Sequence, residues 1–490
     1  PTRVERCRMA LDFQGLFGRA LPTVGPAAGA RLGQVGERLL ELGYERSQID
    51  PLFVNTGLCF RELYKTPGYL KNCQELGGPL ACLVPLFLLR TPQPRALVEE
   101  WLGPEHVQTM LDCNLLAVQD DKLDSLYDLH PCFGNVIVTD HLFVKFDGVI
   151  PNAVYYLGND SYELARLTPR KKIRRALDLC TGSGVQATMA AHHTSMVIGV
   201  DLNPRATAVA AVNSVLNGVG EHCSFLLGDL YGPVARGGFD LITANPPFIP
   251  NPRNDLQWFR SGGESGEEVT QNIFAGLPQF LAPGGTLALV TEYPILKGSD
   301  VLERTRSWID QKSGWGLALL AHHQYSREGY IHKQQPRTGD YEKDCREMER
   351  WLDLYDQLGI EAMASGVFLA RRLEPDDEWL EQKAIRSGSD DLGLTVSHWL
   401  DSLTLFNSQA WLADWKSWTP RLVELKRVLF EHGSSVAVVE FPQPGWPDLD
   451  LDAQDGALLK NLLENPDTPA GQLVDEPFGL QRLGRHGLFC

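Results

Sequence analysis

Four consecutive residues, Asn245, Pro246, Pro247 and Phe248, combine groups that suit recognition of a planar nitrogen. The two prolines fix φ and lack an N–H, so the segment is rigid and presents carbonyl groups. The Asn245 side-chain oxygen and the Pro246 carbonyl can each accept one N–H of an amino or amide group. Phe248 can stack on the conjugated group and exclude water. An ordinary turn is the alternative, because Asn-Pro and Pro-Pro are common in turns.

Three loops upstream carry groups that suit a nucleoside-like ligand. Asp178-Leu179-Cys180-Thr181-Gly182-Ser183-Gly184 follows an apolar run and opens a helix at 185–191, and its glycines allow a close backbone approach. Asp201 can accept from ribose hydroxyls or cap the next helix, near 204–217. Asp229 can accept from an adenine amino group. No P-loop lysine is present, and Ala187 leaves the dinucleotide pattern incomplete.

The elements that position these loops are short apolar runs alternating with helical stretches. The expected strands are 176–179, 196–200, 223–227, 240–244, 286–291, 317–321 and 366–370. This alternation predicts an α/β fold with parallel strands and right-handed crossovers. Ligands of such sheets bind beyond the carboxyl ends of the strands, where the four loops fall.

With 490 residues, the chain is too long for one compact domain. We expect a mainly helical N-terminal domain (1–150), a catalytic domain (151–373) and a small α+β C-terminal domain (374–490). Helical patterns at 31–42 and 95–116, a break at Gly78-Pro79 and two β-rich runs within 123–144, separated by His130–Asn135, resemble a winged-helix module. Such a module either contacts nucleic acid or packs on protein.

In the C-terminal region, six of the eleven tryptophans lie between Trp379 and Trp446. A packed core is favoured over an exposed docking surface. The same region has a strand-like run at 434–441. The alternating acids Asp448, Asp450 and Asp452 favour a solvated turn over a calcium loop, because the EF-hand glycine and terminal glutamate are missing.

Charge and cysteine usage narrow the function classes. The net charge of -17, with 62 acidic and 45 basic residues, disfavours non-specific nucleic-acid binding. The basic run at 170–175 is expected to be a solvated lead-in to a strand. The ten scattered cysteines and twelve histidines form no metal-ligand spacing, which indicates reduced thiols and a cytoplasmic protein without a metal site. The longest apolar run, 80–89, is too short for a membrane span. Oligomeric state is left open.

Taken together, these loops resemble class I S-adenosylmethionine-dependent methyltransferases with an (Asn/Asp/Ser)-Pro-Pro-aromatic signature. That branch includes HemK-like glutamine methyltransferases, "methyltransferase small" rRNA enzymes and adenine-N6 DNA methyltransferases. The resemblance covers about residues 150–373 and implies a Rossmann-like, seven-stranded sheet with S-adenosyl-L-methionine as cofactor. The implied cofactor residues are Asp178, Thr181, Gly182 and Gly184 on the methionine side, Asp201 and Leu202 at the ribose, Asp229 and Leu230 at the adenine, and Asn245. Residues 245–248 become the catalytic loop, and Gly262–Gly266 resembles the stretch that follows it.

Two segments are candidates for substrate contact. The run 155–167, which includes Asp160 and Ser161, occupies the place of a motif that packs over the cofactor, but it departs from the HemK sequence Pro-Arg-Pro-x-Thr-Glu. An insertion between the last two expected strands carries Tyr325, Arg327, Tyr330, His332 and Lys333 and is long enough to shape substrate access. A helix at 340–359 in this insertion is expected to serve packing.

The resulting hypothesis is an N-methyltransferase acting on a protein or peptide amide, of glutamine or asparagine. It needs no general base, because the proton can leave after methyl transfer. The alternative is methylation of an rRNA, tRNA or DNA exocyclic amine (adenine N6 or guanine N2), with the N-terminal module as a docking element. A third hypothesis is a small-molecule methyltransferase or a non-catalytic cofactor-binding protein.

Overall fold

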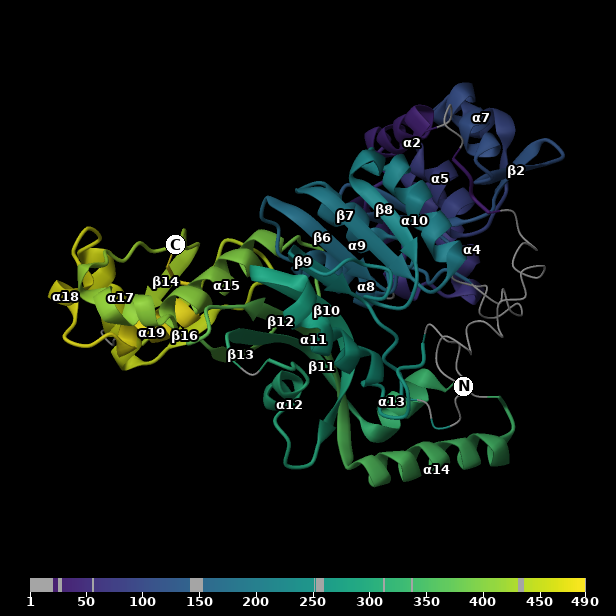
Figure 1. Ribbon diagram of the computed structural model, residues 1–490. Coiled ribbons are helices and arrows are strands. Elements are labelled where there is room, and N and C mark those ends of the chain that lie inside the picture. Colours follow the sequence, from purple (N-terminus) through teal and green to yellow (C-terminus); the bar gives the residue numbers. More distant parts are fainter. Residues whose placement is uncertain are drawn as a thin grey trace. The chain divides into compact units, whose positions relative to one another are not determined.

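The computed structural model describes residues 21–24, 29–54, 57–141, 153–250, 252, 260–311, 313–335, 338–430 and 436–489. The chain forms two compact units (Figure 1). Unit 1 comprises Pro1–Ala165 and Lys172–Pro246, and unit 2 comprises Arg166–Lys171 and Pro247–Cys490. The division into domains 1–150, 151–373 and 374–490 stays a prediction.

Unit 1 contains four parallel strands in the order β9-β6-β7-β8. They are β6 (Ile173–Leu179), β7 (Thr194–Asp201), β8 (Cys223–Leu227) and β9 (Phe239–Ala244), with helices α8 (Asn159–Leu167), α9 (Val185–Ala191) and α10 (Pro204–Leu216). Each of these four strands covers one of the expected apolar runs. The Asn203 side chain, which accepts from Arg205 N at 3.0 Å, caps α10. The alternative in which Asp201 caps this helix is therefore wrong.

The N-terminal part of unit 1 is mainly helical, as expected. Its elements are α2 (Gly29–Glu41), α3 (Arg46–Ile49), α4 (Thr66–Leu76), α5 (Leu80–Leu88), β1 (Gln93–Pro94), α6 (Arg95–Leu102), α7 (Pro104–Asp112), β2 (Leu116–Gln119) and β3 (Lys122–Ser125). The expected helix at 95–116 is two helices, because Gly103 (φ +93°) and Pro104 interrupt it. Strands β1, β3 and β2 form a small antiparallel sheet. The winged-helix comparison stays a prediction.

A second hairpin, β4 (Asp128–Cys132) and β5 (Asn135–Thr139), turns at Phe133-Gly134. The spacer expected over His130–Asn135 is therefore wrong, since most of its residues are in the two strands. Asn213 of α10 bonds to both main-chain groups of Val138, at 2.7 and 2.9 Å. The hairpin is thus fastened to helix α10 within unit 1.

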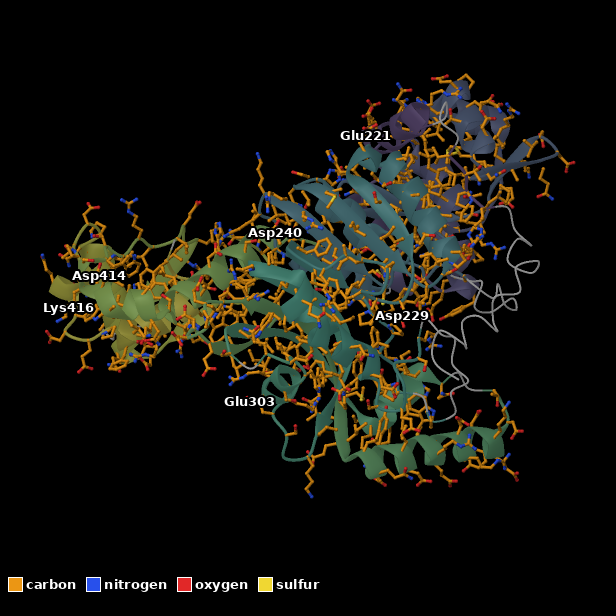
Figure 2. All side chains as sticks on the ribbon, in the orientation of Figure 1. Glu221, Asp229, Asp240, Glu303, Asp414 and Lys416 are labelled. Atoms are coloured by element: carbon orange, nitrogen blue, oxygen red, sulfur yellow. The ribbon has the colours of Figure 1, made fainter. Side chains whose placement is uncertain are left out.

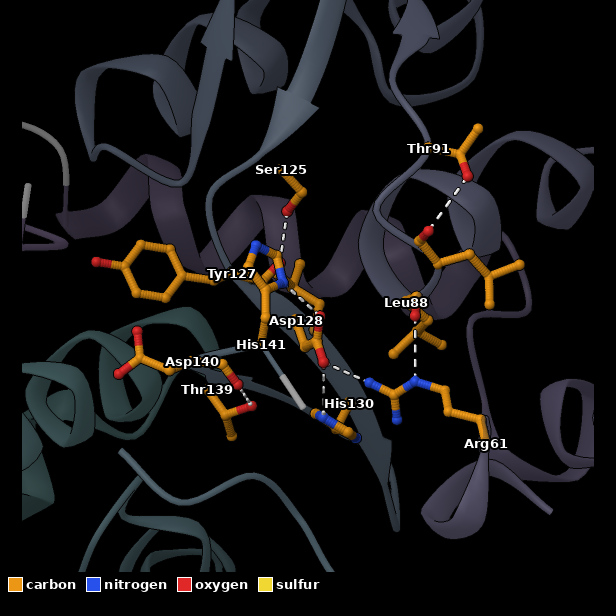
Figure 3. Close-up of polar contacts among 12 residues, drawn as sticks. Arg61, Leu88, Thr91, Ser125, Tyr127, Asp128, His130, Thr139, Asp140 and His141 are labelled. Carbon is orange, nitrogen blue, oxygen red and sulfur yellow. Dashed lines mark hydrogen bonds and ion pairs between the residues drawn. The ribbon is translucent and has the colours of Figure 1, made fainter. Parts of the chain in front are cut away.

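Buried charges lie beside the same hairpin (Figure 3). Asp128 has no exposed surface, pairs with the Arg61 guanidinium and accepts from His141 Nδ1 at 2.6 Å. Burial raises the pKa of Asp128, but Arg61 and His141 outweigh burial and lower it to about 2. Nearby, Arg205 of α10 holds Asp140 through two bonds of 2.8 and 2.5 Å.

Unit 2 contains four strands in the order β13-β11-β12-β10. They are β10 (Leu281–Leu296), β11 (Trp315–Ser326), β12 (Ile360–Arg372) and β13 (Trp379–Ala384), with helices α11 (Glu268–Phe280), α12 (Val301–Ser307), α13 (Arg327–Gln334) and α14 (Tyr341–Leu358). Strand β12 is antiparallel to β10 and β11, and β13 is parallel to β11. Strand β13 was not expected, so the described strands of this α/β fold exceed the seven predicted by one.

The C-terminal part of unit 2 is α+β. Its elements are α15 (Gly393–Phe406), α16 (Gln409–Asp414), β14 (Arg427–Phe430), β15 (Ala437–Glu440), β16 (Leu449–Leu451), α17 (Ala453–Glu464), α18 (Ala470–Leu473) and α19 (Phe478–Arg485). Five of the six clustered tryptophans are buried, Trp399 to 1% exposure, which supports the core interpretation. The solvated turn at Asp448–Asp452 is wrong: Asp450 lies in β16, and Asp452 caps α17.

The basic lead-in at residues 170–175 is not simply solvated. Within unit 2, Arg170 pairs with Asp391 at 3.6 Å and Lys171 pairs with Asp401. Within unit 1, Arg175 lies over the Phe239 ring, 4.6 Å from its centroid. Among the residues that the structure describes, no helix is both long and apolar enough to cross a bilayer.

Candidate active site

The loop after β6 is built around a buried carboxylate. Asp178 is 1% exposed and accepts from Thr181 Oγ1 at 2.5 Å and from Thr243 Oγ1 at 2.8 Å. Burial raises the pKa of Asp178 to about 6, although both hydroxyl donors favour the ionised form. Asp178 therefore fastens the start of the loop to β9, and its contact with a cofactor stays a prediction.

The two glycines of this loop have different surroundings. Both have positive φ, +52° at Gly182 and +76° at Gly184. A Cβ on Gly184 would lie 2.7 Å from Ala210 Cβ, so this glycine allows α10 to pack closely. A Cβ on Gly182 would meet only the Cys180 carbonyl, at 4.0 Å. The backbone at Gly182 is therefore the part of the loop that a ligand can approach.

Asp201 joins the first loop to the second. It ends β7, is 7% exposed, and accepts from Gly182 N and Asn203 N, both at 2.8 Å. Its neighbour Leu202 is half-buried. Two of the expected cofactor loops are thus held together by one carboxylate, whose charge strengthens each backbone bond.

The third loop follows β8 and contains a carboxylate oxygen with an unfilled bonding capacity. Gly228 N donates to Asp201 O at 2.9 Å, which places this loop beside the second. Asp229 Oδ1 is buried and has no hydrogen-bond partner among the described residues. Figure 2 labels Asp229 past the end of β8 and Asp240 near the start of β9, so they lie toward opposite ends of these parallel strands. Leu230 next to Asp229 is half-buried, with φ +44°.

Asn245 follows β9 and is held by α8. Its Nδ2 donates to Asp160 Oδ2 at 2.7 Å and lies 3.4 Å from Ser161 Oγ. A carboxylate only accepts, so the NH2 of the amide must face Asp160. The carbonyl oxygen Oδ1 is then the group left to accept a hydrogen bond from a bound molecule. Asp160 and Ser161, expected at the substrate, are thus brought to Asn245, and the roles expected for all three stay predictions.

The last two residues of the expected catalytic loop belong to unit 2, where Pro247 is buried and Phe248 is half-buried. Phe248 packs against a cluster that includes Ile249, Tyr325 and Tyr330. The segment that resembled the stretch after the loop packs here too. Ile249 N donates to Arg260 O at 2.9 Å, and a Cβ on Gly266 would lie 2.5 Å from Phe248 O.

The insertion residues have contacts of their own. Tyr325 is half-buried in the Phe248 cluster, and Lys333 Nζ lies 4.5 Å from the centroid of its ring. The Arg327 guanidinium pairs with Asp356 at 2.8 Å and donates to Leu352 O at 3.1 Å. Arg327 thus holds α14, and its contact with substrate stays a prediction. As expected, α14 buries aromatic side chains, Trp351 among them.

Sequence reasoning missed Glu292, which lies on β10 and is 8% exposed. Tyr330, Lys333 and Gln334 all bond to it. A single glutamate at the end of an apolar run gives no signal in the sequence. Within the described ranges, no group of three or more His, Cys, Asp or Glu side chains could hold a metal ion.

Comparison with known proteins finds methyltransferases that resemble this chain. Residues 160–309 match the family described as "Methyltransferase small domain". The chain is 33% identical over 143 residues to a ribosomal protein uL3 glutamine methyltransferase of Bradyrhizobium diazoefficiens, covering 27% of this chain and 45% of that protein. It is 36% identical over 127 residues to a release factor glutamine methyltransferase of Rhodospirillum rubrum, covering 24% of this chain and 39% of that protein. The chain thus spans half or less of the length of these two relatives.

A third relative is covered more completely. A Methanocaldococcus jannaschii protein, provisionally named a protein N5-glutamine methyltransferase, is 31% identical over 158 residues, covering 30% of this chain and 79% of that protein. The chain therefore belongs to the methyltransferase small family of class I S-adenosylmethionine-dependent methyltransferases.

Proposed function

We propose that this protein transfers a methyl group from S-adenosylmethionine to the side-chain amide nitrogen of a protein glutamine or asparagine, with glutamine favoured by the names of its relatives. The observation that carries this proposal is the 2.7 Å bond from Asn245 Nδ2 to Asp160, which leaves Asn245 Oδ1 as an acceptor of fixed orientation. A primary amide presents two N–H groups in one plane, and this oxygen and the adjacent Pro246 carbonyl can each accept one.

The first three loops fit the cofactor. The buried, unpartnered Asp229 Oδ1 suits an amino donor such as that of adenine, and the open backbone at Gly182 suits the methionine side. Asp201 and Leu202 would lie at the ribose, Leu230 at the adenine, and Asp178, Thr181 and Gly184 would shape the first loop. When bound, S-adenosylmethionine supplies an activated, positively charged methyl donor.

The chain's own residues then act mainly by positioning. Asn245 and Pro246 orient the amide nitrogen, and preorganised alignment of this kind can contribute ~7–11 kcal/mol. Positive charge develops on the nitrogen as the new bond forms, and the two carbonyl oxygens stabilise it. The Phe248 ring stacks on the amide and excludes water. No side chain needs to remove the proton beforehand, since it becomes acidic once the nitrogen is alkylated.

The test is methylation of synthetic peptides. Glutamine-containing peptides from ribosomal protein uL3 and from a release factor are incubated with the purified chain and S-adenosylmethionine, and mass spectrometry locates any added methyl group. We expect methylation on a glutamine or asparagine amide, lost in Asn245→Ala and retained in Asn465→Ala, a matched change at an exposed asparagine of the C-terminal part.

A cell lysate incubated with the purified chain and labelled S-adenosylmethionine tests the other possible acceptors, nucleic acids and small molecules. Label released by protease supports the proposal. Label released only by nuclease, or confined to small molecules, overturns it in favour of an exocyclic amine or a small-molecule acceptor.

A further inference from the structure

Unit 2 holds a buried carboxylate that the proposed reaction does not use. Glu292 Oε2 accepts from Tyr330 OH at 2.7 Å and from Gln334 Nε2 at 3.2 Å, while Oε1 accepts from the Lys333 ammonium. Three donors compensate the cost of burying the charge. All three belong to α13, so Glu292 fastens this one helix to β10.

The start of α13 is fixed separately. Ser326 Oγ accepts from Gly329 N at 3.1 Å and caps the helix. Arg327 then ties the first turn to α14. Tyr330 is completely buried, and burial followed by the nearby Glu292 charge raises its pKa far above the usual value, so it remains a hydroxyl donor. The helix is therefore held at both ends.

Gln334 connects this helix to the catalytic loop. Its Nε2 donates to Glu292, and its Oε1 accepts from Arg260 Nη2 at 3.0 Å. Glu292 can only accept and Arg260 can only donate, so the amide fits in one orientation. The Arg260 main-chain oxygen in turn accepts from Ile249 N, next to Phe248.

We infer that Gln334 is a positioning residue for the acceptor. Through Arg260 it fixes the backbone at Ile249 and, with it, the ring of Phe248 on which the acceptor amide stacks. This inference rests on the proposed function and extends it: α13, an element of the insertion, positions Phe248 for the acceptor, whereas the loops after β6, β7 and β8 serve the cofactor.

Gln334→Leu is the decisive variant, because leucine fills the same space without either bond. We expect KM for the acceptor peptide to rise about tenfold, the loss expected when a hydrogen bond to a charged group is removed. The dissociation constant of S-adenosylmethionine should stay unchanged. Hydrogen exchange should quicken at the amides of Ile249 and Gly262, which bond within this segment.

Gln481→Leu is the matched control, since Gln481 is half-buried in the same unit and donates to Phe406 O at 2.9 Å. It should change neither KM nor exchange at Ile249. If Gln334→Leu fails to fold, Arg260→Lys keeps the charge but disrupts the same bond and should give the same pattern. Values equal to the control in both measurements overturn the inference. Absence of amide methylation by the unaltered chain would defeat the proposed function instead, and the exchange measurement would still decide the role of Gln334.

Discussion

The proposed cofactor loops of unit 1 and the proposed acceptor element of unit 2, helix α13, are held in different ways. In unit 1, Asp201 accepts from the backbone at Gly182 and Asn203, so the first two loops are joined to each other through one side chain and the main chain. In unit 2, α13 is held by contacts between side chains, with Glu292 and Gln334 at the centre. A carboxylate that bonds to the backbone of neighbouring loops needs only a short stretch of sequence. A network of side chains from distant segments can differ between proteins that bind different methyl acceptors. The comparison teaches that binding of cofactor and of acceptor should be separable by mutation.

The largest expected effect is at Asn245, which is proposed to orient the acceptor and is expected to lie beside the cofactor. Asn245→Ala removes the carbonyl that orients the acceptor, and kcat should fall about 100- to 1,000-fold, as when one preorganised polar contact to the developing charge is lost. Steady-state kinetics and calorimetric titration with S-adenosylmethionine check this. A fall in cofactor affinity of the same size would show that the asparagine serves the cofactor alone.

A smaller effect is expected on the cofactor side. Asp201→Ala removes the acceptor shared by two loops, and hydrogen bonds to charged groups contribute about 1.5–3 kcal/mol. The dissociation constant of S-adenosylmethionine should rise about 10- to 100-fold. Equilibrium binding measures it, with Asp450→Ala, at the exposed position of strand β16, as control. An unchanged constant would contradict the role assigned to this loop.

The Asp160 contact should affect catalysis but not cofactor binding. Asp160→Ala frees Asn245 Nδ2 and lets the amide rotate, so kcat should fall about tenfold, the value of one charge-assisted bond. Asp160→Asn can still accept through its carbonyl and should recover part of this loss. Equal kcat in the two variants would show that orientation of the amide is not what Asp160 provides.

The last expected effect is on stability at low pH rather than on activity, and it compares the two units directly. Burial, followed by Arg61, lowers the pKa of His130 in unit 1 to about 3, with Asp128 opposing the shift and His141 adding to it. Burial, followed by Lys383, lowers the pKa of His486 in unit 2 to about 4, with Asp455 opposing the shift and Arg485 adding to it. Below an unfolded-state pKa of about 6.5 the unfolded chain takes up protons that these folded histidines do not. Stability should therefore fall as pH decreases from about 6.5 toward each folded pKa.

Thermal unfolding of His130→Gln and His486→Gln across this pH range measures the two contributions. Each variant should flatten the pH dependence by at most about 1.4 kcal/mol per pH unit. If unit 1 and unit 2 unfold in separate transitions, each substitution should flatten its own transition. A slope that neither substitution changes would contradict the assignment.

The sequence determined the strands and the positions of the proposed cofactor loops at their ends. Each of the seven strands expected between residues 151 and 373 lies within an observed one, because runs such as 176–179 are buried, mostly apolar segments whose pattern is local. The run expected at 434–441 is described only from residue 436, and its strand is β15 (Ala437–Glu440). Asp201 and Asp229 could be placed at strand ends for the same reason. The break at Gly103-Pro104 was missed because the apolar spacing continues across it, although glycine and proline there end one helix and begin the next.

The tertiary structure alone decided which polar groups meet. Asp160 and Asn245 are 85 residues apart, and nothing local in either segment predicts a bond of 2.7 Å between them. Glu292 and Gln334 are 42 residues apart, and their bond depends on the side-chain packing of α13. The sequence determined the elements and their loops because apolar periodicity and turn chemistry are local, whereas the partners of buried polar groups depend on where distant segments come together.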